Sequence, residues 1–150
     1  MKGLFATICL TIAVLLVSAG FTATSRAGDV IYSKEHRFKA VTIATGLAHP
    51  WGMAFLPGGD LLVTERIGTL RRLSNGILSA ALAGLPEIYA SGQGGLLDVA
   101  LHPDFTKNQW VYLTYSAGGD FGTSTELARG RLQGDRLVDT EVLFVARPKS

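Results

Sequence analysis

The chain has little cysteine, no excess charge outside its first residues, and no pattern typical of a long amphipathic helix. Its single cysteine, Cys9, lies in an apolar N-terminal segment, which excludes disulfide and thiol chemistry from the rest of the chain. The formal net charge is +2, from 14 basic and 12 acidic residues. Without Lys2 and Arg26, 12 basic residues balance the 12 acidic ones, so nothing indicates nucleic acid or an anionic membrane as a partner.

Residues 1–27 have the pattern of a signal peptide. Lys2 gives a positive start, residues 4–20 are almost wholly apolar, and Ser25-Arg26-Ala27 places small residues where a signal peptidase cleaves. We expect cleavage before Gly28 and a periplasmic or secreted protein without stable membrane insertion. An uncleaved membrane anchor is the alternative, since the apolar stretch is near the lower limit for spanning a bilayer.

Two stretches of the mature chain, residues 28–150, follow one pattern about fifty residues apart. Ala54 aligns with Ala100 at an offset of 46 residues, and residues 62–64 align with residues 112–114 at an offset of 50. A small strand, a turn containing proline and a second β-rich strand, repeated at this period, are typical of propeller blades. The sequence therefore predicts an all-β fold that forms the first two to three blades of an incomplete propeller.

Hydrophobic alternation and turn residues predict the individual strands. The expected strands cover residues 38–44, 51–56, 61–66, 69–73, 96–101, 109–115, 125–132 and 138–145. Asn75-Gly76 is the strongest hairpin signal, since both residues tolerate positive φ angles. Residues 142–145 resemble residues 41–44, which predicts that a third copy begins there. A β-sandwich would have the same density of strands, and only the repeat favours a propeller.

The three histidines are the first candidates for acid–base chemistry. His49 and His102 each precede a proline, which indicates turn positions, and His36 lies in a polar stretch near the mature start. No pair of histidines has metal-ligand spacing. Asp98, on a predicted inner strand, is interpreted as a buried, hydrogen-bonded structural carboxylate. We therefore assign neither a catalytic residue nor a metal ligand in this chain.

A glycine-rich stretch, residues 91–97, offers one candidate binding residue. Three glycines surround Gln93 directly before a predicted inner strand. Glycine lets the backbone approach a ligand closely, and the entrance of an inner strand lies at the mouth of the central channel. Gln93 offers a donor and an acceptor together, which suits sugar hydroxyls or a polar cofactor. The alternative is a flexible loop with an exposed glutamine.

Four motifs make the chain resemble a known family. In order, they cover residues 46–57, 62–66, 92–99 and 102–105. They are similar to the start of the soluble glucose/sorbosone dehydrogenases, closest to the periplasmic aldose sugar dehydrogenases that use pyrroloquinoline quinone (PQQ). The resemblance implies a six-bladed propeller that holds PQQ and calcium above its channel. It also implies oxidation of the anomeric carbon of an aldose to a lactone, with two electrons passing to the quinone.

Of the residues that line the family's pocket, only one has a counterpart in this chain, Gln93. The family's catalytic histidine is expected a few residues past Ser150, and the residues that hold calcium and the quinone come later still. The chain alone is therefore expected to be inactive and to bind neither cofactor well. The expected partners of the parent protein are an aldose and an electron acceptor.

Two other functions stay open. A related propeller could be a non-catalytic binding or scaffold protein. It could also be a calcium-dependent lactone hydrolase, for which Glu65 and Asp98 are the candidate metal ligands near the inner strands.

Overall fold

The structure is a computed structural model that describes residues 30–118 and 122–147. The predicted signal peptide, residues 1–27, lies outside the described residues. The chain divides into two compact units, Met1–Val41 and Thr42–Ser150. The described part of the first unit contains an antiparallel pair of short strands, β1 (Val30–Tyr32) and β2 (Arg37–Lys39). Among the described residues, no helix has the length and apolar character needed to cross a membrane.

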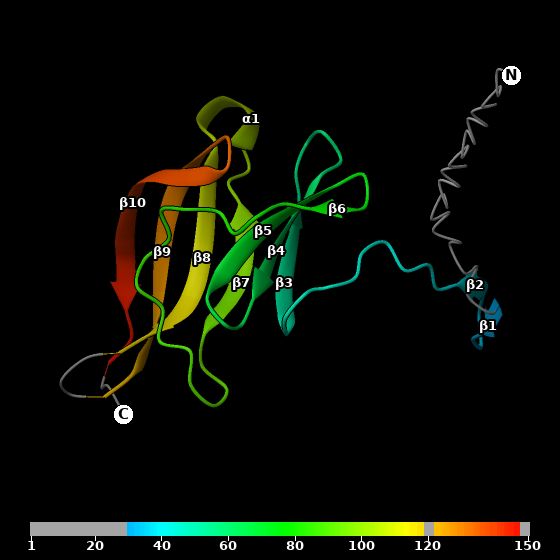
Figure 1. Cartoon of the computed structure of the whole chain (residues 1–150), viewed down its shortest axis with the longest axis horizontal. Coiled ribbons are helices and arrows are strands. Elements are labelled where there is room, and N and C mark those ends of the chain that lie inside the picture. The colour runs from blue at the N-terminus through cyan, green and yellow to red at the C-terminus, as the bar shows by residue number, and fades with distance from the viewer. Residues whose placement is uncertain (1–29, 119–121, 148–150) are drawn as a thin grey trace, which may run out of the picture. The chain divides into compact units, whose positions relative to one another are not determined.

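The second unit consists of two four-stranded antiparallel sheets in chain order (Figure 1). The first sheet contains β3 (Pro50–Phe55), β4 (Leu61–Glu65), β5 (Thr69–Ser74) and β6 (Ile77–Leu78). The second contains β7 (Leu96–Leu101), β8 (Trp110–Ala117), β9 (Ser124–Gln133) and β10 (Arg136–Val145), with the helical turn α1 (Phe105–Asn108) between β7 and β8. The initial strands β3 and β7 contact each other. This all-β arrangement confirms the predicted fold class.

The two sheets have equivalent registers. Ala54 pairs with Leu62 in the first sheet, and Ala100 pairs with Tyr112 in the second. Each β3–β4 or β7–β8 ladder also has a register shift at the same place, directly before Met53 or Val99. The offsets of 46 and 50 residues found in the sequence therefore describe a repeat of hydrogen-bonded pairs.

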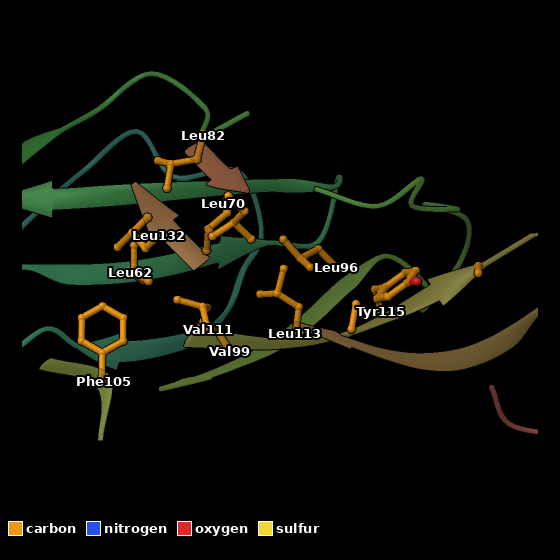
Figure 2. Packing of buried hydrophobic residues seen from close by; sticks show 13 residues of the cluster. Leu62, Leu70, Leu82, Leu96, Val99, Phe105, Val111, Leu113, Tyr115 and Leu132 are labelled. Carbon is orange, nitrogen blue, oxygen red and sulfur yellow. The ribbon is translucent and has the colours of Figure 1, made fainter. Parts of the chain in front are cut away.

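The main core fills the space between the two sheets (Figure 2). Leu62 and Leu70 from the first sheet face a larger set of apolar side chains from the second. In Figure 2, Phe105 lies at one end of this core and Tyr115 at the other. A smaller cluster on the opposite face of the first sheet contains Leu61, Val63 and Leu73, with Ala44, Leu47 and Leu78 packed against it. Because both faces of β4 are covered, all five of its residues are buried.

Two details of the sequence prediction are wrong, one on a strand and one on the repeat. Residues 41–44 form no strand, since Ala44 packs against the outer face of the first sheet and pairs with no neighbouring strand. Residues 142–145 belong to β10, the fourth strand of the second sheet, where Val142 pairs with Ala128. Those residues do not begin a third copy. The Asn75-Gly76 turn is confirmed, with φ angles of 49° and 79°.

Candidate functional site

Gln93 lies in the loop that leads from the first sheet into β7. The side chain is exposed, and glycines flank it on both sides. The loop is held by backbone hydrogen bonds: Gly94 N–H donates to the Ser91 carbonyl over 2.8 Å, and Ser116 N–H donates to the Gly95 carbonyl over 2.8 Å. The structure therefore presents Gln93 to solvent on a loop whose C-terminal end is attached to β8. Its role in binding stays a prediction.

Arg66, which directly follows β4, contacts this loop at two points. Its guanidinium Nη1 donates to the Gly92 carbonyl, and its own carbonyl accepts the Leu96 N–H over 3.2 Å. A Cβ atom at position 95 would overlap with the Arg66 carbonyl, and Gly95 has a φ of 152°. Only glycine allows this approach. Arg66 also lines a cavity of about 100 Å³ beside Ser91, Gly92 and Gly94.

Thr64 joins three strands beneath the loop. Its Oγ1 accepts the Gly52 N–H over 2.8 Å and lies 2.5 Å from the Leu97 carbonyl, to which the hydroxyl donates. Gly52, Thr64 and Leu97 belong to β3, β4 and β7, so one buried hydroxyl connects the two sheets at their initial strands. No motif in the sequence indicates this role of Thr64, because Leu97 lies 33 residues away along the chain.

The histidines occupy turns. His102 Nδ1 lies 2.9 Å from the Asp104 backbone nitrogen and 2.9 Å from the Asn108 side-chain amide, which closes the turn after β7. The His49 carbonyl accepts the Arg66 N–H over 3.0 Å. His36 closes a short turn with Ser33 in the first unit. These contacts are those expected for turn residues.

The two carboxylates considered as metal ligands are engaged with the protein itself. Glu65 is 3% exposed; its Oε1 accepts the Ala48 N–H over 2.7 Å, and its Oε2 accepts the Thr69 hydroxyl. Asp98 is exposed, not buried as a strand position suggested, and its Oδ1 accepts the N–H of Val99 over 2.9 Å. Within residues 30–118 and 122–147, no group of three or more His, Cys, Asp or Glu side chains could hold a metal ion.

A second polar feature was missed by the sequence analysis. The buried Tyr115 hydroxyl donates to Glu126 Oε2 over 2.8 Å, beside a cavity of about 610 Å³ that Tyr89 and Val142 also line. Burial, and then the hydrogen bond to Glu126, raises the pKa of Tyr115 above its usual value. No local sequence motif joins these residues, since they come from different strands and meet only across the β8–β9 ladder.

Comparison with known proteins identifies the family of the chain. The family model for Glucose / Sorbosone dehydrogenase matches residues 47–150. The chain belongs to the glucose/sorbosone dehydrogenase family. The matched residues include the whole of both four-stranded sheets, so the repeat and the Gln93 loop are features of the family region.

Individual members of the glucose/sorbosone dehydrogenase family are similar to part of the chain. Aldose sugar dehydrogenase YliI from Escherichia coli is 45% identical over 108 residues, which are 69% of this chain and 29% of that protein. Quinoprotein glucose dehydrogenase B from Acinetobacter calcoaceticus is 32% identical over 133 residues, 84% of this chain and 28% of that protein.

A solved structure agrees with these sequence matches. The PQQ-bound aldose sugar dehydrogenase from Streptomyces coelicolor superposes with a TM-score of 0.63 and 36% identity, over 72% of this chain and 33% of that chain. The chain thus spans about a third or less of the length of the proteins that it matches. The structural similarity confirms that the two sheets are part of a propeller of this family.

Proposed function

We propose that this chain forms the first part of a PQQ-dependent dehydrogenase that oxidises the anomeric carbon of an aldose to a lactone. The observation that carries the proposal is the similarity in both sequence and fold to an aldose sugar dehydrogenase whose structure contains PQQ. The match to a quinoprotein glucose dehydrogenase supports the same chemistry. When bound, the quinone would supply the acceptor for the two electrons removed from the sugar.

In this proposal Gln93 is the residue of the chain that contacts the sugar or the quinone. Its amide offers one donor group and one acceptor, which suits neighbouring hydroxyl or carbonyl groups of a ligand. The glycines on either side leave the side chain exposed, and the contacts of Gly92 and Leu96 with Arg66 fix the loop relative to the first sheet.

The described residues do not fit a complete cofactor site. Glu65 and Asp98 are bonded to backbone groups, and no group of three potential metal ligands occurs in the described part of the chain. We therefore assign no reaction step to calcium or quinone held by these residues. We place the general base and the groups that hold both cofactors beyond Ser150, as the family resemblance implies.

The proposal includes export. Residues 1–27 would direct the chain to the periplasm or the outside and be removed there. N-terminal sequencing of exported material should begin near Gly28. Recovery of protein that still carries Met1 in the membrane fraction would contradict cleavage.

Dye reduction tests the proposed activity. The full-length protein, supplied with PQQ and calcium, should reduce a redox dye with glucose as substrate, and residues 28–150 alone should not. Failure of the full-length protein with every aldose tried would favour a binding or scaffold propeller. Hydrolysis of a lactone without PQQ would favour the hydrolase, although the bonds of Glu65 and Asp98 do not support that function.

The Gln93→Ala variant of the full-length protein tests the site. Loss of one partner of a ligand hydrogen bond costs about 1–3 kcal/mol, so the affinity for sugar or quinone should fall roughly tenfold to a hundredfold. The controls are His49→Ala and His102→Ala, which should lower stability and leave the specific activity of the folded protein nearly unchanged. Full activity and affinity in the Gln93→Ala variant would remove this assignment, and an inactive but folded His102→Ala variant would give that residue a catalytic role.

A further inference from the structure

The contacts of Arg66 connect the first sheet to both sides of Gln93. Its N–H donates to the carbonyl of His49, which precedes β3, over 3.0 Å. Its carbonyl accepts from Leu96 on the C-terminal side of Gln93, and its guanidinium donates to Gly92 on the N-terminal side. One residue thus holds the start of β3, the end of β4 and both ends of the segment that carries Gln93.

The loop needs such a contact because its own bonds are few. Gly92, Gly94 and Gly95 have no side chains that could pack, and glycine has the largest backbone freedom of any residue. Within the loop, the 2.8 Å bond from Gly94 to Ser91 is local and spans only three residues. The Arg66 guanidinium is therefore the side-chain group that restrains the backbone on the N-terminal side of Gln93.

We propose that Arg66 is a positioning residue that fixes Gln93 for ligand binding by holding the Gly92 carbonyl. This inference rests on the proposed role of Gln93. Arginine suits the task because its planar guanidinium presents several donors in a rigid fork, so a single side chain gives the carbonyl a directed donor. Lysine at position 66 keeps the charge without this geometry and restores the loop only in part.

Hydrogen exchange in the full-length protein tests the contact without reference to activity. In the Arg66→Ala variant, the amides of residues 92–95 should exchange about tenfold faster, since the loss of one hydrogen bond lowers the free energy of local opening. Arg72→Ala is the matched control. Arg72 donates through Nη2 to the Gly134 carbonyl over 2.9 Å, which is the same kind of contact at a different loop. The control should leave exchange at 92–95 unchanged.

A double-mutant cycle tests whether Arg66 acts through Gln93. Arg66→Ala should raise the KM for the aldose about threefold to tenfold with little change in kcat, because the loop samples unproductive positions. If Arg66 works only by positioning Gln93, the Arg66→Ala/Gln93→Ala double variant should bind no worse than Gln93→Ala alone. Arg66→Lys should lie between the wild type and Arg66→Ala.

The outcomes separate the two proposals. Unchanged exchange at residues 92–95 in Arg66→Ala, or fully additive effects in the double variant, would overturn the positioning role. Faster exchange together with a Gln93→Ala variant of normal affinity would overturn the ligand role of Gln93, and with it the positioning of a binding residue, while leaving the family assignment intact.

Discussion

Gly52 and Asp98 occupy the same position in the two sheets, 46 residues apart, and so do Thr64 and Thr114, 50 apart. In each sheet the threonine hydroxyl accepts the backbone N–H of its partner, Gly52 over 2.8 Å and Asp98 over 3.0 Å. The local hydrogen bond is thus repeated. The surroundings are not: Thr64 is fully buried and also reaches Leu97 of the second sheet, whereas Thr114 is only partly buried.

The neighbouring sheet accounts for this difference. Gly52 lies against the backbone of β7, and any Cβ there would overlap with the Asp98 side chain. Asp98 itself lines, with Thr114 and Leu127, a small cavity of about 80 Å³ on the outer face of the second sheet. The Asp98 side chain fits beside β3 because position 52 has no Cβ, and Asp98 itself stays exposed to solvent. Only glycine fits at position 52, which the second sheet covers.

Exchanging the residues at this position should have the largest effect. Gly52→Asp would force β3 away from β7 and place a second carboxylate beside Asp98. We expect it to destabilise the full-length protein by about 3 kcal/mol, which urea unfolding would measure. The reverse change, Asp98→Gly, should cost less than about 1 kcal/mol, since glycine only loosens an exposed strand position.

The combined exchange sharpens this test. Removing the Asp98 side chain should restore part of the stability lost in Gly52→Asp, because the overlap with Oδ1 disappears. The Asp98 Cα and the Leu97 carbonyl would still lie 3.1 and 3.3 Å from the new Cβ, so recovery should be incomplete. Equal costs for the two single variants would show that the contact between β3 and β7 does not distinguish the sheets.

Substitutions of the two threonines should differ in their cost to stability, by less than the two substitutions at the Gly52 and Asp98 position. Thr64→Val keeps the shape but leaves the Gly52 N–H and the Leu97 carbonyl unpaired in a buried site, which should cost about 2–3 kcal/mol. Thr114→Val should cost about 0.5–1 kcal/mol, because water can reach the Asp98 N–H. Thermal or urea unfolding of both variants would measure the difference, and a Thr114 effect as large as that of Thr64 would mean that the second site is covered in the full-length protein.

A third equivalent pair, Glu65 and Tyr115, leads to a prediction about pH. The folded protein raises the pKa of Tyr115 above its usual 10.0, so the unfolded chain releases this proton first. The stability that Tyr115 contributes is therefore complete below pH 10 and falls as the pH rises further. Tyr115→Phe should be less stable by about 1 kcal/mol at pH 8, and the gap should close towards pH 11. A difference in the free energy of unfolding between the variant and the wild type that stays constant from pH 8 to pH 11 would contradict the raised pKa of Tyr115.

Sequence reasoning predicted the repeat well because both copies follow the same alternation. Ala54 and Ala100 are small residues next to large ones on short inner strands, and this pattern fixes which residues pair. It failed in two respects: residues 41–44 form no strand, and residues 142–145 form a strand but do not begin a third copy. The two segments have the same β-branched and apolar composition. Composition indicates an extended, partly covered segment, but it does not say whether the segment pairs with a strand or packs on the face of a sheet.

The sequence indicated the candidate site only where the residues that reveal it are neighbours along the chain. Gln93 stands out because glycines surround it in the sequence. The roles of Arg66 and Thr64 depend on contacts with residues 26 and 33 positions away, which no local pattern indicates. The same holds for the pair of Tyr115 and Glu126, whose side chains meet because β8 and β9 are antiparallel.

The turn between β3 and β4 has a practical consequence. Gly58 and Gly59 have open space around them, with nothing within 4 Å of an added Cβ. This turn lies at the end of β4 opposite to Arg66, so it is remote from the Gln93 loop along the strand. Exposed turns of small residues tolerate insertions well. Residues 28–150 contain no cysteine, so a cysteine placed there would be the only thiol of this part of the chain and would couple it to a support with the Gln93 loop directed away.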